Sequence, residues 1–333
     1  MDLRAGEGRL LFSMSLILAL VTGAHTVLET ARDTLFLSKL PPDRLAFVYV
    51  LLAALSLVVG ALSSAISRRF GRRAGFVITL GLSAYAITVL YLRPPTPLSV
   101  FVLYITSGVI GTILMLQFWL FAGQLFSVAQ GKRLFGAMAA GGVLGATIGA
   151  TVAAVMLRFV AAQTLLVVGA VTFLAAALCV TIVPTEEEVD ATDPTPVSPF
   201  AWLKDVSLLR DNRYVALIGT LVAVSTAAVL ITDYLFKSTA AVAYPKDLGT
   251  FLGGYYAVQN AMSLFVQVVL TGAIVRKLGV TSALLLFPVL LASGALGVFI
   301  TGGFAFALGA KATDGSLRHS LHRVTSELLL LPL

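Results

Sequence analysis

The chain has 333 residues, of which 58% are apolar and 12% are charged, with a formal net charge of +7 and a mean hydropathy of +0.97. A soluble domain carries about 25% charged residues, so this composition excludes a soluble enzyme, a fibre and a disordered chain. The positive charge does not indicate a nucleic-acid partner, because basic residues in a multispanning protein gather in cytoplasmic loops. We therefore expect an integral membrane protein.

Nine stretches of the sequence lack Asp, Glu, Lys and Arg and are at least about 18 residues long, enough for a helix to cross about 30 Å of hydrocarbon. Strands of a membrane barrel would alternate apolar and polar residues, and the stretches show no such alternation. They predict an all-α protein in the lipid bilayer, with spans near residues 10–28, 45–67, 74–92, 94–131, 134–157, 159–185, 214–232, 248–275 and 278–310.

The acidic, proline-rich segment after Val183, PTEEEVDATDPTPVSPF, divides the predicted spans into two groups. Its composition is typical of a linker. We predict a six-helix bundle over residues 1–183, a cytoplasmic linker over 184–207 and a second bundle over 208–333. If successive spans cross the membrane in alternating directions, most of the Lys and Arg residues in the loops lie on the same side as the N-terminus. Because basic loops are usually cytoplasmic, this predicts a cytoplasmic N-terminus. The expected location is the bacterial inner membrane.

The two groups of spans contain similar segments. Asp33-Thr34-Leu35-Phe36-Leu37-Ser38 in the first corresponds to Asp233-Tyr234-Leu235-Phe236-Lys237-Ser238 in the second. A repeat of this size predicts two bundles around a central cavity, the arrangement used for alternating access. The pattern resembles the major facilitator architecture, which has twelve helices in its complete form. Here we expect about ten, with an incomplete second half that ends in the tenth helix, as in a fragment or an unusual member.

Ionisable residues lie at membrane depth in the first and seventh predicted helices. Glu29, Arg32 and Asp33 follow the first apolar stretch, and Asp233 and Lys237 follow the seventh. Such residues normally face a bundle interior and bind a substrate or one another. If the first helix continues, its three charged residues share one face. The alternative is that Arg32, like Lys39, extends from a helix end to the membrane surface.

The tenth predicted helix is polar beyond the apolar stretch 304–310. It suits an anion pathway, a proton relay or a cytoplasmic segment bound to a partner, with the residues Lys311, Asp314, Arg318, His319, His322, Arg323 and Glu327. The two histidines lack a third ligand, so no metal is predicted. No cofactor is predicted either. The spans carry no nucleophile–base pair and no catalytic glycine elbow, so an enzyme is not expected.

Glycines recur every four residues in the fifth stretch, at Gly141, Gly145 and Gly149. Small residues let membrane helices approach closely. A phosphate-binding loop is the weaker interpretation, because no Walker-type lysine follows. We predict a tightly packed helix face.

At four places the chain resembles the ATP/ADP translocase family, the nucleotide carriers of obligate intracellular bacteria and of chloroplasts. Arg32-Asp33-Thr34-Leu35 is similar to the family's Lys-Asp-Thr-Leu, and Phe118-Trp119-Leu120-Phe121-Ala122-Gly123-Gln124 to its Phe-Trp-x-Phe-Ala-x-Gln. Asp233 with Phe236-Lys237 corresponds to an acid followed by Trp-Lys. The last segment, from Ser320 to Leu333, is similar to the family's Thr-Lys-Glu segment that ends in Ile-Pro-Leu.

The resemblance implies exchange of a nucleotide or another phosphorylated anion by alternating access, with ATP and ADP as the candidates that the family suggests. The family binds nucleotide through helices one, four, seven and ten, which gives the predicted substrate residues Arg32, Asp33, Asp233, Lys237, Lys311, Arg318 and Glu327. Two positions depart from the family: Ser107 stands near the fourth-helix acid, and Ser326 replaces the tenth-helix lysine, for which Arg318 could substitute. The alternative function is a non-transporting membrane sensor or scaffold, with a soluble domain beyond the C-terminus. Exchange, uniport and proton coupling stay open.

Overall fold

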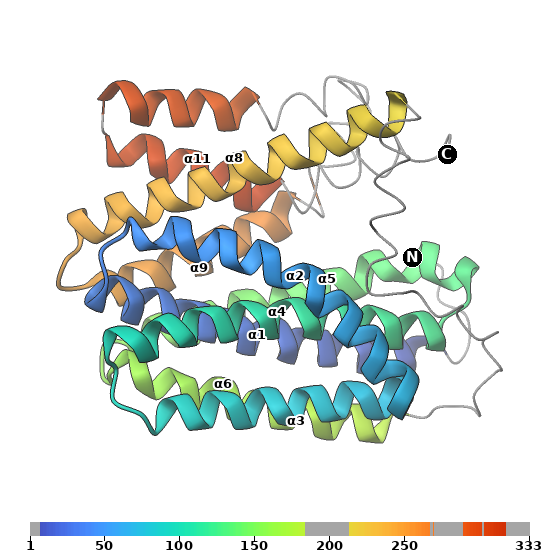
Figure 1. Ribbon diagram of the computed structural model, residues 1–333. Helices are drawn as coiled ribbons and strands as arrows, with labels where there is room; N and C mark the ends of the chain where they lie inside the picture. The colour runs from blue at the N-terminus through green and yellow to red at the C-terminus, as the bar shows by residue number, and fades with distance from the viewer. Residues whose placement is uncertain (1–6, 184–212, 267–268, 270–288, 302, 318–333) are drawn as a thin grey trace.

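The computed structural model describes residues 7–183, 213–266, 269, 289–301 and 303–317, and within them every regular element is helical. The predicted all-α class is thus confirmed. Figure 1 shows long helices lying side by side. They are α1 (Glu7–Lys39), α2 (Arg44–Phe70), α3 (Arg72–Tyr91), α4 (Pro97–Leu125), α5 (Val128–Met156), η1 (Ala162–Thr164), α6 (Leu165–Ile182), α8 (Arg213–Ala243), α9 (Leu248–Phe265), the helix Val289–Thr301 and α11 (Phe304–Leu317).

Six of these helices are long and apolar enough to cross a membrane within the described residues, and all six belong to α1–α6. Large apolar side chains such as Phe12, Phe47 and Phe159 are exposed on the outside of the bundle. Inside the helices, threonine hydroxyls such as those of Thr26 and Thr30 donate to the carbonyl one turn earlier, which satisfies them without water. The surface and the interior both suit a lipid environment.

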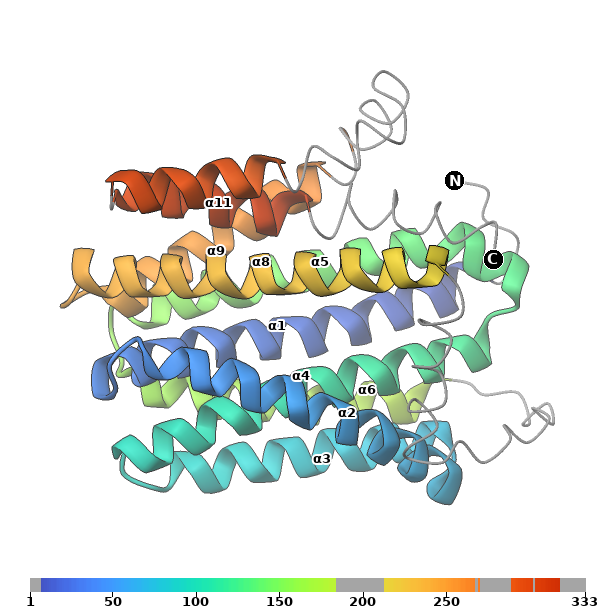
Figure 2. The ribbon, with the colours of Figure 1, turned by 45° about the horizontal axis from the view of Figure 1, so that its top comes forward.

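Helix α1 lies in the middle of the molecule and packs against α4, α5, α6 and α9 (Figures 1 and 2). Its contact with α5 depends on glycine: a Cβ atom at Gly141 would lie 2.9 Å from the Cβ atom of Ser15, and one at Gly23 would lie 2.9 Å from the Gly145 carbonyl oxygen. The Thr22 hydroxyl donates to the carbonyl of Gly142 over 2.6 Å. The prediction of a tightly packed face on α5 is confirmed.

The apolar stretch 94–131 contains parts of two helices, which differs from the single predicted span. Helix α4 ends at Leu125, Phe126 is extended, and α5 begins at Val128 behind the N-cap Ser127. The Ser127 side chain accepts from the backbone N–H of Gln130, whose own side chain accepts from the backbone N–H of Ser127. This reciprocal capping box starts the helix inside a stretch of sequence that carries no charge.

Two helices continue well beyond their apolar stretches. Helix α1 runs to Lys39 and α8 runs to Ala243, so the charged residues after residue 28 and after residue 232 are helical. The stretch 278–310 is divided, because it contains both the end of the helix Val289–Thr301 and the start of α11. The predicted linker 184–207 lies outside the described residues, so the division of the chain there stays a prediction.

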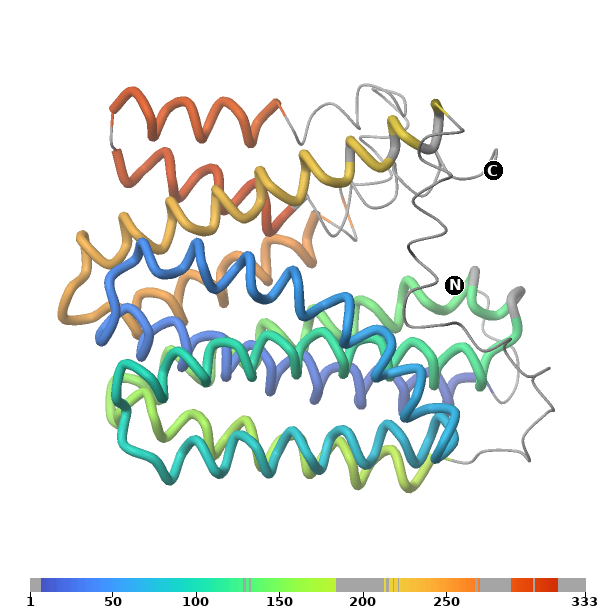
Figure 3. The backbone as a smooth tube through the Cα atoms, viewed as in Figure 1, coloured from blue at the N-terminus to red at the C-terminus, as the bar shows by residue number. Residues whose placement is uncertain are grey.

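The first six helices meet the later ones near the end of α1 and the start of α2, which we call the α1–α2 end. A Cβ atom at Gly249 of α9 would lie 2.8 Å from Thr34, and one at Gly253 would lie 2.9 Å from the backbone of Ala154 in α5. Figures 1 and 2 show α2 near α8 at this end and diverging from it toward the other end of α2, and the tube in Figure 3 follows the same course. The two sets of helices are therefore joined closely at the α1–α2 end.

Candidate functional site

Three charged side chains of α1 form the first part of a polar cluster at the α1–α2 end. The Arg32 guanidinium lies 3.3 Å from a Glu29 carboxylate oxygen and 3.4 Å from an Asp33 oxygen. It donates to the Ser107 hydroxyl of α4 over 3.2 Å and lies 4.5 Å from the ring centroid of Tyr104. Arg32 is 8% exposed and Asp33 is fully buried. Arg32 therefore points into the bundle and does not reach out to the membrane surface.

Helix α8 supplies the second part of the cluster. Its Lys237 ammonium lies 2.8 Å from Asp233, one turn earlier, and 3.0 Å from Asp33 of α1. The same ammonium donates to the Tyr104 hydroxyl over 2.9 Å. Lys237 is only 1% exposed. It joins α8 to both α1 and α4.

Helix α11 supplies a further cation and acid. The Lys311 ammonium lies 2.8 Å from Asp233 and 3.3 Å from Asp314, which is one turn along the same helix. The Lys311 carbonyl accepts from the Gln259 amide of α9 over 3.2 Å. These contacts hold α11 against α8 and α9, and they give Asp233 two cationic partners.

Three tyrosines complete the cluster and were not among the predicted site residues. The Tyr256 hydroxyl of α9 donates to Asp33 over 2.9 Å, and the Tyr49 hydroxyl of α2 donates to Asp233. Tyr104 of α4 accepts from Lys237 and packs its ring edge-on against Phe36 at 5.0 Å between centroids. A tyrosine in an apolar stretch is too common to indicate a site, so the sequence offered no signal for these three.

The cluster brings together five of the seven predicted substrate residues: Arg32, Asp33, Asp233, Lys237 and Lys311. Arg318 and Glu327 lie outside the described residues. The serine that stands near the expected fourth-helix acid, Ser107, is buried and contacts Arg32. The charged members within the described residues are four acids, Glu29, Asp33, Asp233 and Asp314, and three bases, Arg32, Lys237 and Lys311.

Every cation of the cluster is compensated within it, as burial in a membrane protein requires. Each cation has at least two carboxylate neighbours within 3.4 Å. The Glu29 side chain, with 33% exposure, is the most accessible acid among the ion pairs. A polar ligand that reaches the cluster would therefore meet Glu29 first.

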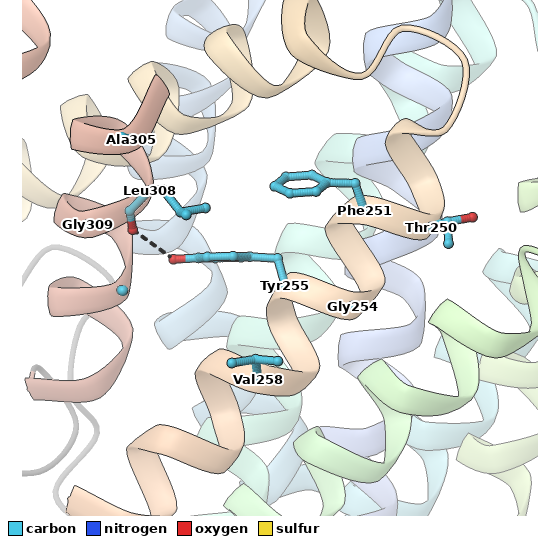
Figure 4. A pocket seen from close by; sticks show the side chains of 9 residues that line it. Thr250, Phe251, Gly254, Tyr255, Val258, Ala305, Leu308 and Gly309 are labelled. Atoms are coloured by element: carbon cyan, nitrogen blue, oxygen red, sulfur yellow. Dashed lines mark hydrogen bonds between the residues drawn. The ribbon is translucent and has the colours of Figure 1, made fainter. Parts of the chain in front are cut away.

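A separate groove lies between α9 and α11, with a volume of ≈ 560 Å³ (Figure 4). It is open and almost wholly apolar, and it is lined by side chains such as Phe251, Val258 and Leu308. Tyr255 crosses it and donates to the Leu308 carbonyl over 3.3 Å. No charged residue lines it, so we place the candidate site for a polar ligand at the charged cluster.

The comparison with known proteins identifies the architecture. The family model described as Major Facilitator Superfamily matches residues 9–314, and no curated protein matches the sequence. A solved structure of a mutant of the nucleoside transporter NupG is similar, with TM-score 0.71 and 12% identity, over 95% of this chain and 82% of that one.

Two further solved structures are similar to the chain. The xylose transporter XylE from E. coli gives a TM-score of 0.61 at 15% identity, over 97% of this chain and 85% of that one. A bacterial homologue of the human lysosomal transporter Spinster gives 0.59 at 14% identity, over 99% and 80%. At these identities the structures show the fold alone, and the family match confirms the predicted major facilitator-like class.

Proposed function

The chain belongs to the Major Facilitator Superfamily, and we propose that this multispanning secondary transporter carries a nucleotide or another phosphorylated organic anion by alternating access. One observation carries the substrate class: a guanidinium and two ammonium groups from three helices meet in one buried cluster. Buried cations of this kind mark substrate paths in membrane proteins.

Arg32 is the preferred contact for a phosphoryl group. Its planar fork can bind two oxygens of a phosphate at once, whereas the ammonium groups of Lys237 and Lys311 act as point charges. Its distances to Glu29 and Asp33, 3.3 and 3.4 Å, are longer than those of the lysines to Asp233, both 2.8 Å. The guanidinium is thus the least tightly paired cation of the three.

We propose that, without substrate, the carboxylates make the contacts to Arg32 that the substrate's phosphoryl group makes when it binds. In the ligand-free cluster Glu29 and Asp33 neutralise Arg32, which avoids an isolated buried charge. A phosphate would replace the more accessible of them, Glu29, at the guanidinium, and its attraction to the neighbouring lysines would add to the binding. Arg318 and Glu327 are proposed to extend this substrate set, as the predicted last helix implies.

A second candidate substrate is an uncharged nucleoside or sugar. It is favoured by the excess of acids over bases in the described cluster and by the three tyrosines, whose rings and hydroxyls suit such ligands. NupG is described as a nucleoside transporter and XylE as a xylose transporter. The two candidates differ in one respect that an experiment can measure, which is the need for a phosphoryl group.

The test is thermal stabilisation of the purified protein in detergent by ATP, ADP, inorganic phosphate, adenosine and xylose. A ligand at 100 times its Kd stabilises the native state by about 2.7 kcal/mol, which gives a rise in Tm of about 5 °C. We expect nucleotides to raise Tm in the wild type and not in Arg32→Gln. Arg44→Gln, a change of the same kind at an exposed arginine, should leave the shift intact.

The remaining outcomes decide between the alternatives. Stabilisation by adenosine alone would support the uncharged substrate. Nucleotide binding without uptake into liposomes would support a non-transporting sensor. No shift with any nucleotide or with phosphate, or a shift that Arg32→Gln retains, would refute the proposed substrate site.

A further inference from the structure

A histidine lies one turn before the charged cluster on α1. His25 precedes Glu29 by four residues and Arg32 by seven, so the three side chains share one face of the helix. The Nδ1 atom of His25 is buried and has no hydrogen-bond partner among the described residues. A buried polar atom without a partner is costly and calls for an explanation.

The neighbouring helix α4 leaves room for this imidazole. A Cβ atom at Gly111 would lie 2.8 Å from the Nε2 atom of His25, so any larger residue at position 111 would displace the ring. The fold therefore accommodates His25 at this site between α1 and α4, which lie side by side in Figures 1 and 2.

The charged groups that follow His25 on its own helix are Glu29, Arg32 and Asp33. The other helices packed on α1 bring no charge to this depth, because α4, α6, α9 and residues 134–156 of α5 contain no Asp, Glu, Lys or Arg. The titratable groups that they add near the cluster are the hydroxyls of Tyr104 and Tyr256. Glu29 is thus the acid nearest to His25 along the helix face, and its side chain is 33% exposed.

The charge count points in the same direction. The described cluster has four acids and three bases, so a protonated imidazole at position 25 would supply the fourth positive charge. An imidazole is the side chain whose charge changes most readily near neutral pH.

We infer that His25 is a proton-binding site linked to anion binding at Arg32 through the shared carboxylate of Glu29. The inference rests on the proposed function. When His25 takes up a proton, Glu29 pairs with the imidazolium, and the Arg32 guanidinium becomes available to the phosphoryl group. When His25 loses the proton, Glu29 returns to Arg32 and displaces the anion. One proton and one substrate anion then move together, which is symport.

The first experiment needs no substrate. The protein labelled with ¹⁵N-histidine contains three imidazoles, and His25→Asn identifies the signals of His25 by their loss. We expect these signals to change with pH as the imidazole takes up a proton. Signals of His25 that stay constant over the whole pH range in which the protein is folded would overturn the inference.

The second experiment measures the linkage. Uptake of one proton with the anion makes the Kd of ATP rise about tenfold for each unit of increasing pH, because the coupling is reciprocal. The ionisation of ATP itself contributes equally in every variant, so the difference in slope between proteins reports His25. We expect His25→Asn and Glu29→Gln each to lower the slope by about one, since either removes the link.

The two failures can be told apart. Equal slopes in the wild type, His25→Asn and Glu29→Gln would overturn the linkage while leaving the anion site standing. Absence of ATP and phosphate binding at every pH would overturn the anion part of the linkage together with the proposed function, and the imidazole signals would still decide whether His25 binds a proton. The melting temperature of each variant confirms that it is folded.

Discussion

Lys237 is the residue whose loss most directly tests the charged cluster. Its ammonium contacts Asp33, Asp233 and the Tyr104 hydroxyl within 3.0 Å, and it is 1% exposed. Breaking a buried pair by removing one partner costs about 3–5 kcal/mol, because the other charge stays buried. Asp33 keeps Arg32 and Asp233 keeps Lys311, so we expect the lower end of that range for Lys237→Met.

The assay is thermal unfolding in detergent, where a loss of about 3 kcal/mol lowers Tm by about 5 °C or more. Lys246→Met removes an exposed lysine and serves as the matched control, with an expected change within about 0.5 kcal/mol. The double variant Asp33→Asn/Lys237→Met restores the charge balance and should be more stable than Lys237→Met alone, with a coupling of about 0.5–3 kcal/mol. A Tm of Lys237→Met equal to that of Lys246→Met, or strictly additive losses in the double variant, would refute the cluster as described.

Two further predictions concern the contact between the two sets of helices. In Gly253→Val the new Cβ atom would lie 2.9 Å from the backbone of α5, so we expect Tm to fall by several degrees. The control is Gly254→Val, whose Cβ atom would meet no atom within 4 Å and which should leave Tm unchanged. Equal Tm values for the two variants would contradict the close approach of α9 to α5. Tyr256→Phe removes the hydroxyl that donates to Asp33 and should lower the free energy of unfolding by about 1 kcal/mol. The control is Tyr244→Phe, whose side chain is partly exposed and which should cause no measurable loss. A Tyr256→Phe protein as stable as the wild type would show that this hydrogen bond contributes nothing.

The helices could be predicted from the sequence because lipid demands long apolar stretches. Their ends could not, because hydropathy reports where a helix meets lipid and not where its hydrogen bonds stop. Helix α1 continues to Lys39 since its charges are compensated inside the bundle. The break after Leu125 could have been predicted from Ser127 and Gln130, whose spacing is that of a capping box. It was missed because the stretch 94–131 contains no charged residue to mark the end of a span.

The charges of the site could be predicted and their partners could not. A buried ionisable residue in a membrane helix is rare enough to indicate a site by itself, which is how Arg32 and Lys237 were found. The tyrosines are ordinary in composition, and their partners are distant in sequence: Tyr49 is 184 residues from Asp233, and Tyr256 is 223 residues from Asp33. Only the packing of the helices brings such pairs together.

The pairing within the cluster explains how its two sides could separate during transport. The polar contacts of the cluster that cross between the two sets of helices are those of Lys237 and Tyr256 with Asp33, of Lys237 with Tyr104, and of Tyr49 with Asp233.

If these contacts break, no charge is stranded, because Asp33 keeps Arg32 on α1, Asp233 keeps Lys237 on α8, and Asp314 keeps Lys311 on α11. The polar part of the cost of opening the α1–α2 end is then that of several hydrogen bonds, about 1 kcal/mol each, and not that of isolating a buried ion. A substrate bound to the cluster on either side can supply that amount through its differential affinity for the two conformations, which is the condition for alternating access.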